Sequence, residues 1–210
     1  MHARKTMIKG SPEQTEQARQ VIESHVIPKA KELRGFRGGY WLIDREAGET
    51  MSFTFFDTKK DLEASEDAAA QLRSSGVAQI QGASVAGVHN YEVGLSTGEK
   101  VHDRASHARV LTFEGDPKDV NRAVKAIEEN VVPALKQVPG FLGGFWLVDR
   151  DSAKGIGVTL FDSGASITGS RERAAALRSQ TAKRIGGKVG EFREYEVLAR
   201  AATPAGAAAG

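Results

Sequence analysis

An internal repeat constrains the fold of this chain more than any other feature of its sequence. A shift of 105 positions aligns residues 3–82 with residues 108–187 without a gap, and 29 of the 80 aligned pairs are identical. The most similar blocks are GFRGGYWLIDR, which begins at Gly35, and GFLGGFWLVDR, which begins at Gly140. Self-similarity at a fixed period indicates one structural unit that is used more than once. We therefore expect two copies of the same fold.

The repeat also sets the expected domain boundaries. The first repeat is expected to occupy residues 1–95 and the second residues 107–200. Residues 96–106 are mostly polar and are interpreted as a linker, and residues 201–210 are rich in alanine and glycine and are interpreted as a disordered tail.

Hydrophobic periodicity predicts the same order of elements in each repeat: strand, helix, strand, strand, helix, strand. This order is typical of the ferredoxin-like βαββαβ unit, in which both helices cover one face of a four-stranded antiparallel sheet. The predicted fold class is therefore α+β. The strands of the first repeat are expected at RKTMIK, GGYWLIDR, MSFTFFD and HNYEVG, and those of the second at RVLTFE, GGFWLVDR, IGVTLFD and REYEVL.

Local signals place the ends of the first helix in each repeat. Ser11 and Asp116 are each followed by proline, the pattern of an N-cap residue with proline at the first helical position. Ser11 and Gln14 also have the spacing of a capping box. Pro28 and Pro133 lie near the far end, where proline should kink or stop the helix.

The sheet face opposite the helices is too apolar and aromatic to be left in water, so something must cover it. We expect the two repeats to pack sheet to sheet as a single-chain pseudo-dimeric α/β barrel, because tethering gives the second copy a high effective concentration. The alternative is two independent units, each pairing with another chain. The expected assembly is a monomer with an internal pseudo-dimer, or a dimer of such chains.

Composition excludes several classes of function. Lysine and arginine (29) nearly balance aspartate and glutamate (27) and are interspersed with them, so nucleic acid is not an expected partner. No apolar run reaches the roughly 20 residues that a membrane span needs, and no secretory signal is present, which predicts a cytoplasmic protein without a membrane partner. The chain contains no cysteine, and its five histidines lack metal-ligand spacing. We expect neither metal nor cofactor.

The run from Pro12 through GFRGGYWLIDR to the helix around Ala64, present in two copies, resembles the antibiotic-biosynthesis-monooxygenase-like families of the dimeric α/β barrel superfamily. The resemblance implies a cofactor-independent oxygenase of a small aromatic or polyketide-type substrate. Its alternative is a non-catalytic small-molecule-binding or stress-associated barrel protein. The histidine pattern of a heme-degrading member is not found. Whether the protein is an enzyme, and which ligand it binds, stay open, because fold does not settle function.

Strand alternation divides the third strand of the first repeat into two faces. Met51, Phe53 and Phe55 form a uniformly apolar face that we assign to the helices, and the face with Ser52 and Thr54 is expected to line a pocket in the interior of the barrel. The double glycines in both second strands are expected to bend the strand or to admit another group closely.

Candidate pocket residues are polar or aromatic positions that recur, or nearly recur, in both copies. The tryptophans could stack on a flat ligand or simply fill the core. Arginine, tyrosine and histidine suit an oxygenase that must deprotonate a phenol and hold the anion, but the same residues suit surface pairs and interfacial hydrogen bonds. The candidates are Arg4, Trp41, Thr54, His89, Tyr91, Arg109, Trp146, Thr159, Arg193 and Tyr195.

Overall fold

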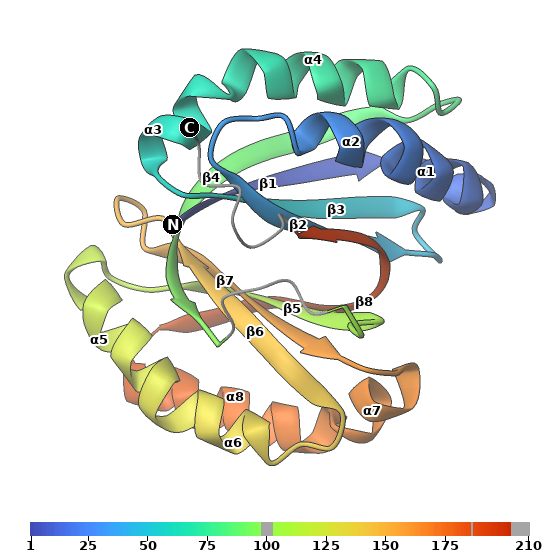
Figure 1. Ribbon diagram of the computed structural model, residues 1–210. Helices are drawn as coiled ribbons and strands as arrows, with labels where there is room; N and C mark the ends of the chain where they lie inside the picture. The colour runs from blue at the N-terminus through green and yellow to red at the C-terminus, as the bar shows by residue number, and fades with distance from the viewer. Residues whose placement is uncertain (98–102, 186, 203–210) are drawn as a thin grey trace. The chain divides into compact units, whose positions relative to one another are not determined.

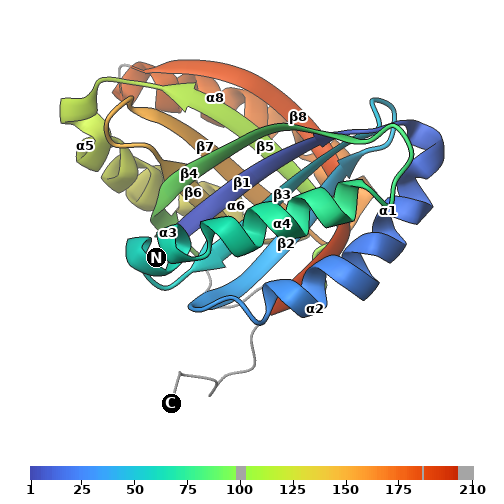
Figure 2. The ribbon, with the colours of Figure 1, turned by 90° about the horizontal axis from the view of Figure 1, so that it is seen from above.

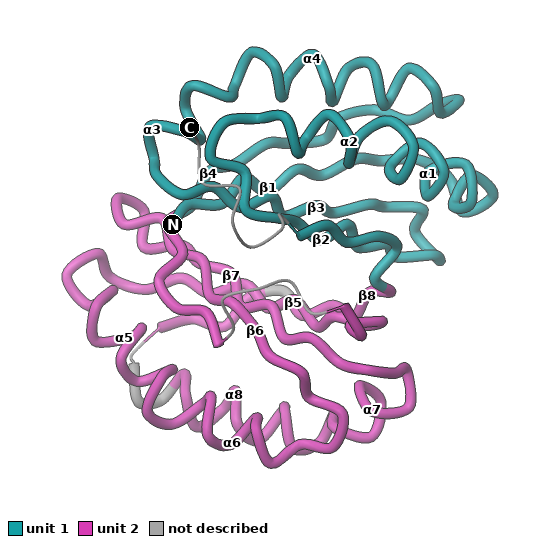
Figure 3. The backbone as a smooth tube through the Cα atoms, in the orientation of Figure 1, with its two compact units in different colours: residues 1–91, 197–210 teal, residues 92–196 magenta. Residues whose placement is uncertain are grey.

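The protein is described by a computed structural model that covers residues 1–97, 103–185 and 187–202 (Figure 1). The chain divides into two compact units, which Figure 3 colours separately. Unit 1 combines Met1–Tyr91 with the segment that begins at Val197, and unit 2 is Glu92–Glu196.

Unit 1 is an antiparallel sheet with helices on one face, visible in the upper half of Figure 1. Figure 2 shows β4 beside β1. The first helix is a succession of short segments, and the second is divided at Ser65. The elements are β1 (His2–Lys9), η1 (Pro12–Gln14), α1 (Thr15–Val21), η2 (Ile22–Val26), α2 (Ile27–Ala30), β2 (Phe36–Asp44), β3 (Glu49–Phe56), α3 (Lys59–Ala64), α4 (Glu66–Val77) and β4 (Ser84–Ser96).

Unit 2 repeats this order, with its helices along one face of its own sheet (Figure 1). Its second helix is divided at Ser170, the position that corresponds to Ser65. The elements are β5 (His107–Glu114), η3 (Pro117–Asp119), α5 (Val120–Ala126), η4 (Ile127–Val131), α6 (Val132–Lys136), β6 (Phe141–Val148), β7 (Lys154–Phe161), α7 (Gly164–Gly169), α8 (Arg171–Ile185) and β8 (Lys188–Ala202).

The hydrogen-bonded order of the strands is β1-β3-β2-β8-β5-β7-β6-β4, a closed barrel. This order confirms the predicted α+β class and the single-chain pseudo-dimeric barrel. The last strand of each repeat is long, and it begins in one unit and ends in the other: β4 passes the boundary after Tyr91, and β8 passes it after Glu196. The compact units therefore differ from the sequence repeats at these two strands.

The expected linker and tail are partly structured. Ser96 belongs to β4, and the backbone N–H of Thr97 donates to the carbonyl oxygen of Gly144 at 2.9 Å. Ala105 is fully buried, and the Ser106 hydroxyl donates to the carbonyl oxygen of Asp162 at 2.6 Å. The rest of the linker, residues 98–102, and residues 203–210 of the tail lie outside the described residues, whereas residues 201–202 belong to β8.

The two predictions about the first helix have different outcomes. Of the two alternatives at Pro28 and Pro133, a stop is wrong: a π-helical turn, η2 or η4, interrupts the regular helix directly before each proline-containing segment, as is typical of a kink, and the helix continues beyond it. Proline lacks an N–H and crowds the carbonyl four residues earlier, and a wider turn accommodates both effects. The capping box also fails, since the Ser11 side chain makes no cap hydrogen bond, while the Asp116 carboxylate accepts from the N–H of Lys118 at 3.1 Å.

The double glycines bend the strand, as predicted. Gly38 (φ 147°) and Gly143 (φ 150°) each lie at a β-bulge in the ladder with the neighbouring strand. The second glycine of each pair admits both the backbone of the neighbouring strand and the tryptophan two residues later. A Cβ atom added to Gly39 would lie 2.9 Å from the carbonyl oxygen of Phe53 and 3.1 Å from the ring of Trp41. One added to Gly144 would lie 2.5 Å from the carbonyl oxygen of Val158 and 3.2 Å from the ring of Trp146.

Candidate functional site

Each unit contains a cavity of about 90 Å³ between its helices and the sheet. The unit 1 cavity is bounded by β1, β2 and β3 on one side and by α1, η2 and α4 on the other. The unit 2 cavity is bounded by β5, β6, β7 and β8 and by η4, α6 and α8. One ordered water needs only roughly 10–15 Å³, so each cavity has room for a larger ligand.

The strand register arranges the floor of the unit 1 cavity in rows that run across β1, β3 and β2. The middle row has two hydroxyls beside an indole, which gives this floor a polar stripe. The three rows are Arg4–Thr54–Gly39, Thr6–Ser52–Trp41 and Ile8–Thr50–Ile43.

The prediction for the third strand was therefore wrong in its orientation. Ser52 and Thr54 line the cavity on the helix side. Met51, Phe53 and Phe55 are buried on the opposite face of the strand. Alternation separated the two faces correctly, but the assumption that helices cover the more apolar face failed, because a cavity with polar groups lies under the helices.

Arg4 of β1 is a buried cation at one end of the unit 1 cavity, with 2% of its surface exposed. Its guanidinium donates to the carbonyl oxygen of Leu62 at 2.8 Å and to the Ser65 hydroxyl at 3.2 Å, and it pairs with the Glu66 carboxylate at 2.7 Å. It also lies 5.3 Å from the ring centroid of Phe56. Burial lowers the pKa of Arg4, because it disfavours the charged form, while the negative charge of Glu66 opposes this effect.

Arg73 of α4 is the second cation of this cavity. Its Nη2 atom pairs with the other oxygen of Glu66 at 2.6 Å, so the carboxylate bridges Arg73 and Arg4. The Nε atom of Arg4 and the Nη1 atom of Arg73 are enclosed, and neither has a hydrogen-bond partner among the described residues. Two arginines and one glutamate leave a net positive charge, with donors that an anionic ligand could satisfy.

The floor of the unit 2 cavity follows the same register with different chemistry. Leucine and glycine replace the two hydroxyl residues of the middle row, so the indole of Trp146 has apolar neighbours. A Cβ atom added to Gly157 would lie 2.9 Å from Nε1 of Trp146, so this glycine is required for the position of the indole. The rows are Arg109–Thr159–Gly144, Leu111–Gly157–Trp146 and Phe113–Gly155–Val148.

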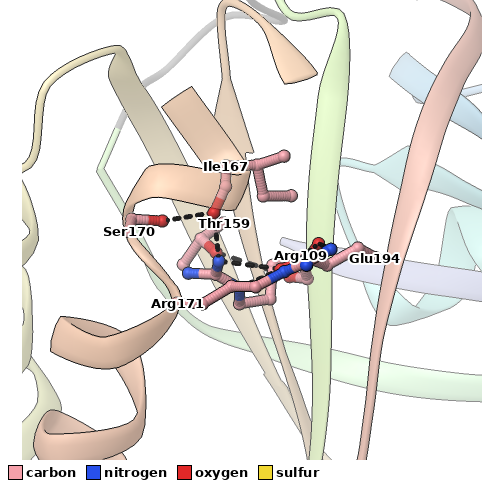
Figure 4. A network of polar contacts seen from close by, with 6 residues as sticks. All are labelled: Arg109, Thr159, Ile167, Ser170, Arg171 and Glu194. Carbon is pink, nitrogen blue, oxygen red and sulfur yellow. Dashed lines mark hydrogen bonds and ion pairs between the residues drawn. The ribbon is translucent and has the colours of Figure 1, made fainter. Parts of the chain in front are cut away.

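The buried cation of unit 2 is Arg109, which Figure 4 shows with its partners. Its Nη2 atom donates to the carbonyl oxygen of Ile167 at 2.6 Å and to Oε1 of Glu194 at 2.9 Å. Arg171 donates to Oε2 of the same carboxylate from Nε at 3.0 Å and from Nη2 at 2.7 Å. Both oxygens of Glu194 are therefore occupied.

Charge and burial act in opposite directions in this network. Burial lowers the pKa of Arg109, and the hydrogen bond and charge of Glu194 oppose this effect. Partial burial alone would raise the pKa of Glu194, but the hydrogen bonds and charges of Arg171 and Arg109 together outweigh it, so its pKa lies below the usual value.

Six of the ten candidate residues line the cavities. Arg4, Trp41 and Thr54 line the unit 1 cavity, and Arg109, Trp146 and Thr159 line the unit 2 cavity. The tryptophans are 4% and 5% exposed and belong to the hydrophobic clusters under the helices, so they fill the core and line the cavity at once. The threonine hydroxyls face the backbone carbonyl oxygens of the two arginines, at 3.5 and 3.4 Å.

The other four candidates lie outside the cavity linings. His89 is exposed, Tyr91 and Arg193 are half-buried, and Tyr195 is buried, but none of them lines either cavity. Strand alternation accounts for the position of Arg193, because its neighbour Phe192 points to the helix side and lines the unit 2 cavity.

The second cation of each cavity was not among the residues predicted from the sequence. Arg73 and Arg178 line the two cavities from the second helix of each repeat. They were visible in the alignment of the repeats, where Leu-Arg-Ser is identical in both copies at this point. Glu66 and Glu194 could not be found in this way, because neither carboxylate recurs in the other copy.

Metal-binding clusters and membrane-spanning helices are not found in the described part of the chain. The described residues contain no group of three or more histidine, aspartate or glutamate side chains placed to hold a metal ion. No histidine is among the described residues that line the two cavities. Within residues 1–97, 103–185 and 187–202, no helix has both the length and the apolar character that a membrane crossing requires.

The chain has relatives of low identity. It is 23% identical over 198 residues to an uncharacterized protein of Mycobacterium tuberculosis (strain ATCC 25618 / H37Rv), an alignment that covers 94% of this chain and 83% of the relative. A second uncharacterized protein of that strain is 25% identical over 199 residues, with 94% and 87% covered. No family model matches the chain.

Solved structures share the fold over nearly the whole chain. An anthrone oxidase-like protein has a TM-score of 0.67 at 20% identity, with 99% of this chain and 96% of that chain covered. A candidate monooxygenase from Fusobacterium nucleatum has a TM-score of 0.67 at 14% identity, with 96% and 94% covered. A Listeria monocytogenes ferredoxin-fold protein related to antibiotic biosynthesis monooxygenases has a TM-score of 0.53 at 10% identity, with 94% and 95% covered. The chain thus shares the fold of these proteins, which confirms the fold that the resemblance in the sequence implies.

Proposed function

We propose that the protein is a cofactor-independent oxygenase of a small aromatic or polyketide-type molecule that binds in the unit 1 cavity. One observation carries the proposal. The cavity places an indole, two hydroxyls and a pair of arginines around one space, and each arginine has an N–H group without a partner among the described residues. A flat, hydroxylated, anionic molecule matches each of these groups, since its rings pack on Trp41 and its oxygens accept from the arginines.

The reaction requires no external reductant. A substrate methylene reacts with one dioxygen: its two C–H bonds break, one oxygen atom forms the new carbonyl, and the other leaves with the two hydrogens as water. The substrate supplies all the electrons that reduce oxygen. The carbanion, formed by loss of a C–H proton, is stabilised as an enolate or phenolate. Arg4 and Arg73 would hold the developing oxyanion, the role of preorganised donors in a site with little water.

The residues that line the cavity favour a substrate that is itself acidic. Its described lining contains neither a carboxylate nor an imidazole, and the nearby Glu66 carboxylate is engaged by two arginines. A substrate that loses its proton in solution and is captured as the anion needs no base from the protein. One structural neighbour is described as anthrone oxidase-like, and acidic methylenes of that kind fit this requirement.

The absence of a base among the described lining residues also favours a second function, a non-catalytic carrier of the same anions. Oxygen uptake separates the two. Purified protein is mixed with anthrone and hydroxylated anthrones in an oxygen electrode, and product is followed by mass spectrometry. The oxygenase consumes one dioxygen for each carbonyl formed, whereas a carrier binds the compound without accelerating uptake.

The variant Arg73→Gln tests the assigned site. We expect it to lower kcat/KM about 100-fold, because it removes a donor to the oxyanion. The matched variant Arg178→Gln changes the corresponding residue of unit 2 and should leave the rate within about threefold of wild type. Equal losses in both variants, or a loss only in Arg178→Gln, would place the reaction elsewhere.

A further inference from the structure

The unit 2 cavity differs from the unit 1 cavity in the polarity of its walls. Leu111 and Gly157 occupy the places of Thr6 and Ser52, and Phe192 of β8 adds an aromatic ring. A hydroxylated ligand would find few partners on this floor, and an unsubstituted ring would lose little by entering it.

Arg178 of α8 is the cation of this cavity that lacks an anion among the described residues. Its guanidinium lies 4.1 Å from the ring centroid of Phe192, and its Nη1 atom is enclosed without a hydrogen-bond partner in the described part of the chain. An enclosed N–H without an acceptor is unfavourable, and more so in a charged group. Arg178 lines the cavity, so an anionic ligand there would neutralise its charge and offer an acceptor to its guanidinium.

The carboxylates of unit 2 do not supply that acceptor. Glu194 uses one oxygen for Arg109 and the other for Arg171. In unit 1, by contrast, Arg73 shares the carboxylate of Glu66. Among the side chains that the structure describes, no carboxylate forms an ion pair with Arg178.

We infer that the unit 2 cavity is a separate binding site for an apolar aromatic carboxylate. The ring lies among Trp146, Phe192 and Leu111, and the carboxylate accepts from Arg178. Two ligand classes thus correspond to two cavities: hydroxylated anions to unit 1 and unsubstituted aromatic carboxylates to unit 2. This inference is independent of the proposed oxygenase activity, because binding at unit 2 requires no reaction.

The two tryptophans of the chain provide one reporter in each cavity. Indole N–H signals in a ¹⁵N-labelled full-length protein are assigned with Trp41→Phe and Trp146→Phe, and 2-naphthoate is titrated in. We expect the Trp146 signal to shift at concentrations that leave Trp41 unchanged. Naphthalene-2-methanol, a neutral compound of similar shape, should bind at least about tenfold more weakly, because it lacks the charge.

Substitutions at the cation identify the anchor. Arg178→Gln should weaken binding of 2-naphthoate about tenfold or more, and Arg178→Lys should restore part of the affinity because it keeps the charge. The matched Arg73→Gln variant should leave the response of Trp146 unchanged. Circular dichroism of each variant verifies that it is folded.

Three results would overturn the inference: equal shifts of both indoles, equal affinity for the neutral compound, or an unchanged affinity in folded Arg178→Gln. Failure of oxygen uptake with anthrones would reject the proposed function alone. A shift of Trp146 in a protein without that activity would still support the second site.

Discussion

Each unit has a buried arginine at the same position of its first strand. The carboxylate that pairs with this arginine comes from a different element in each unit. Arg4 and Arg109 lie at equivalent positions of β1 and β5, and both donate to a backbone carbonyl oxygen in the first segment of the second helix, that of Leu62 in α3 or Ile167 in α7. The carboxylate is Glu66 of α4 in unit 1 and Glu194 of β8 in unit 2. A buried guanidinium requires an anion within reach, but it does not require that anion to come from a particular element.

The position of Glu66 carries the opposite charge in unit 2. Arg171 occupies the position that corresponds to Glu66, and it binds the carboxylate that β8 supplies. One consequence is that the second-helix arginine shares the carboxylate in unit 1 but not in unit 2. The different ligand preferences that we infer for the two cavities follow from this difference in the position of the carboxylate.

Removing the carboxylate should have its largest effect in unit 2. We expect Glu194→Ala to lower the free energy of unfolding by about 3 kcal/mol, because Arg109 keeps a buried charge without its partner. Glu66→Ala also leaves a buried arginine, Arg4, without its partner, but we expect a smaller loss of about 2 kcal/mol, since the Glu66 side chain is 44% exposed against 16% for Glu194 and its pair is more strongly screened. Urea denaturation measures both values. Equal losses would show that the position of the carboxylate has no energetic consequence.

The middle rows of the two cavity floors should differ in their tolerance of an alanine at the matched position of β3 or β7. Gly157→Ala places a Cβ atom 2.9 Å from Nε1 of Trp146, so we expect a loss of about 2 kcal/mol from overpacking. Ser52→Ala, at the matched position of unit 1, should change stability by less than about 1 kcal/mol. Urea denaturation together with tryptophan fluorescence detects the change. A stable Gly157→Ala with an unshifted Trp146 spectrum would contradict the assigned role of the glycine.

The bulge glycines should behave alike in both units. Gly38 and Gly143 have φ angles of 147° and 150°, a region that residues with a Cβ atom rarely occupy. Alanine at either position should cost about 1 kcal/mol, and the two costs should agree within experimental error. Thermal unfolding of the two variants compares them. A clear difference would show that the strands, and not only the cavities, have diverged.

The smallest expected effect concerns acid pH. The folded-state pKa of Glu194 lies below its ordinary value, 4.5, so its contribution to stability is present above that value and is lost as the pH falls through the folded-state pKa. Urea midpoints measured across this acid range should fall less steeply in Glu194→Gln than in wild type. Glu66→Gln is the comparison in unit 1. Identical slopes for wild type and Glu194→Gln would reject the assignment.

The fold could be predicted because the hydrophobic pattern of each element occurs twice in the chain, once in each repeat. The order of the strands and helices, the bulge at the double glycines and the equivalence of Trp41 and Trp146 all follow from residues that recur in phase. Arginine at position 73 recurs in the same way, so the missed cation was recoverable from the alignment.

The orientation of the sheet faces was not recoverable from alternation. A strand with one apolar and one mixed face does not reveal which face the helices cover, and here the mixed face of β3 lies under them. The ion pairs were also beyond sequence reasoning, because Glu66 and Glu194 lie 128 positions apart and share no local motif. Only the packed structure shows that they serve the same kind of cation.

The passage of β8 across the unit boundary has a consequence for synthesis on the ribosome. Unit 2 is a continuous segment, Glu92–Glu196, whereas unit 1 needs the residues from Val197 onward to provide the neighbour of β2. The N-terminal half of the chain is therefore translated first but completed last. Until β8 leaves the ribosome, one edge of the unit 1 sheet has unpaired backbone groups. This nascent intermediate is the form in which chaperone binding or aggregation would compete with folding.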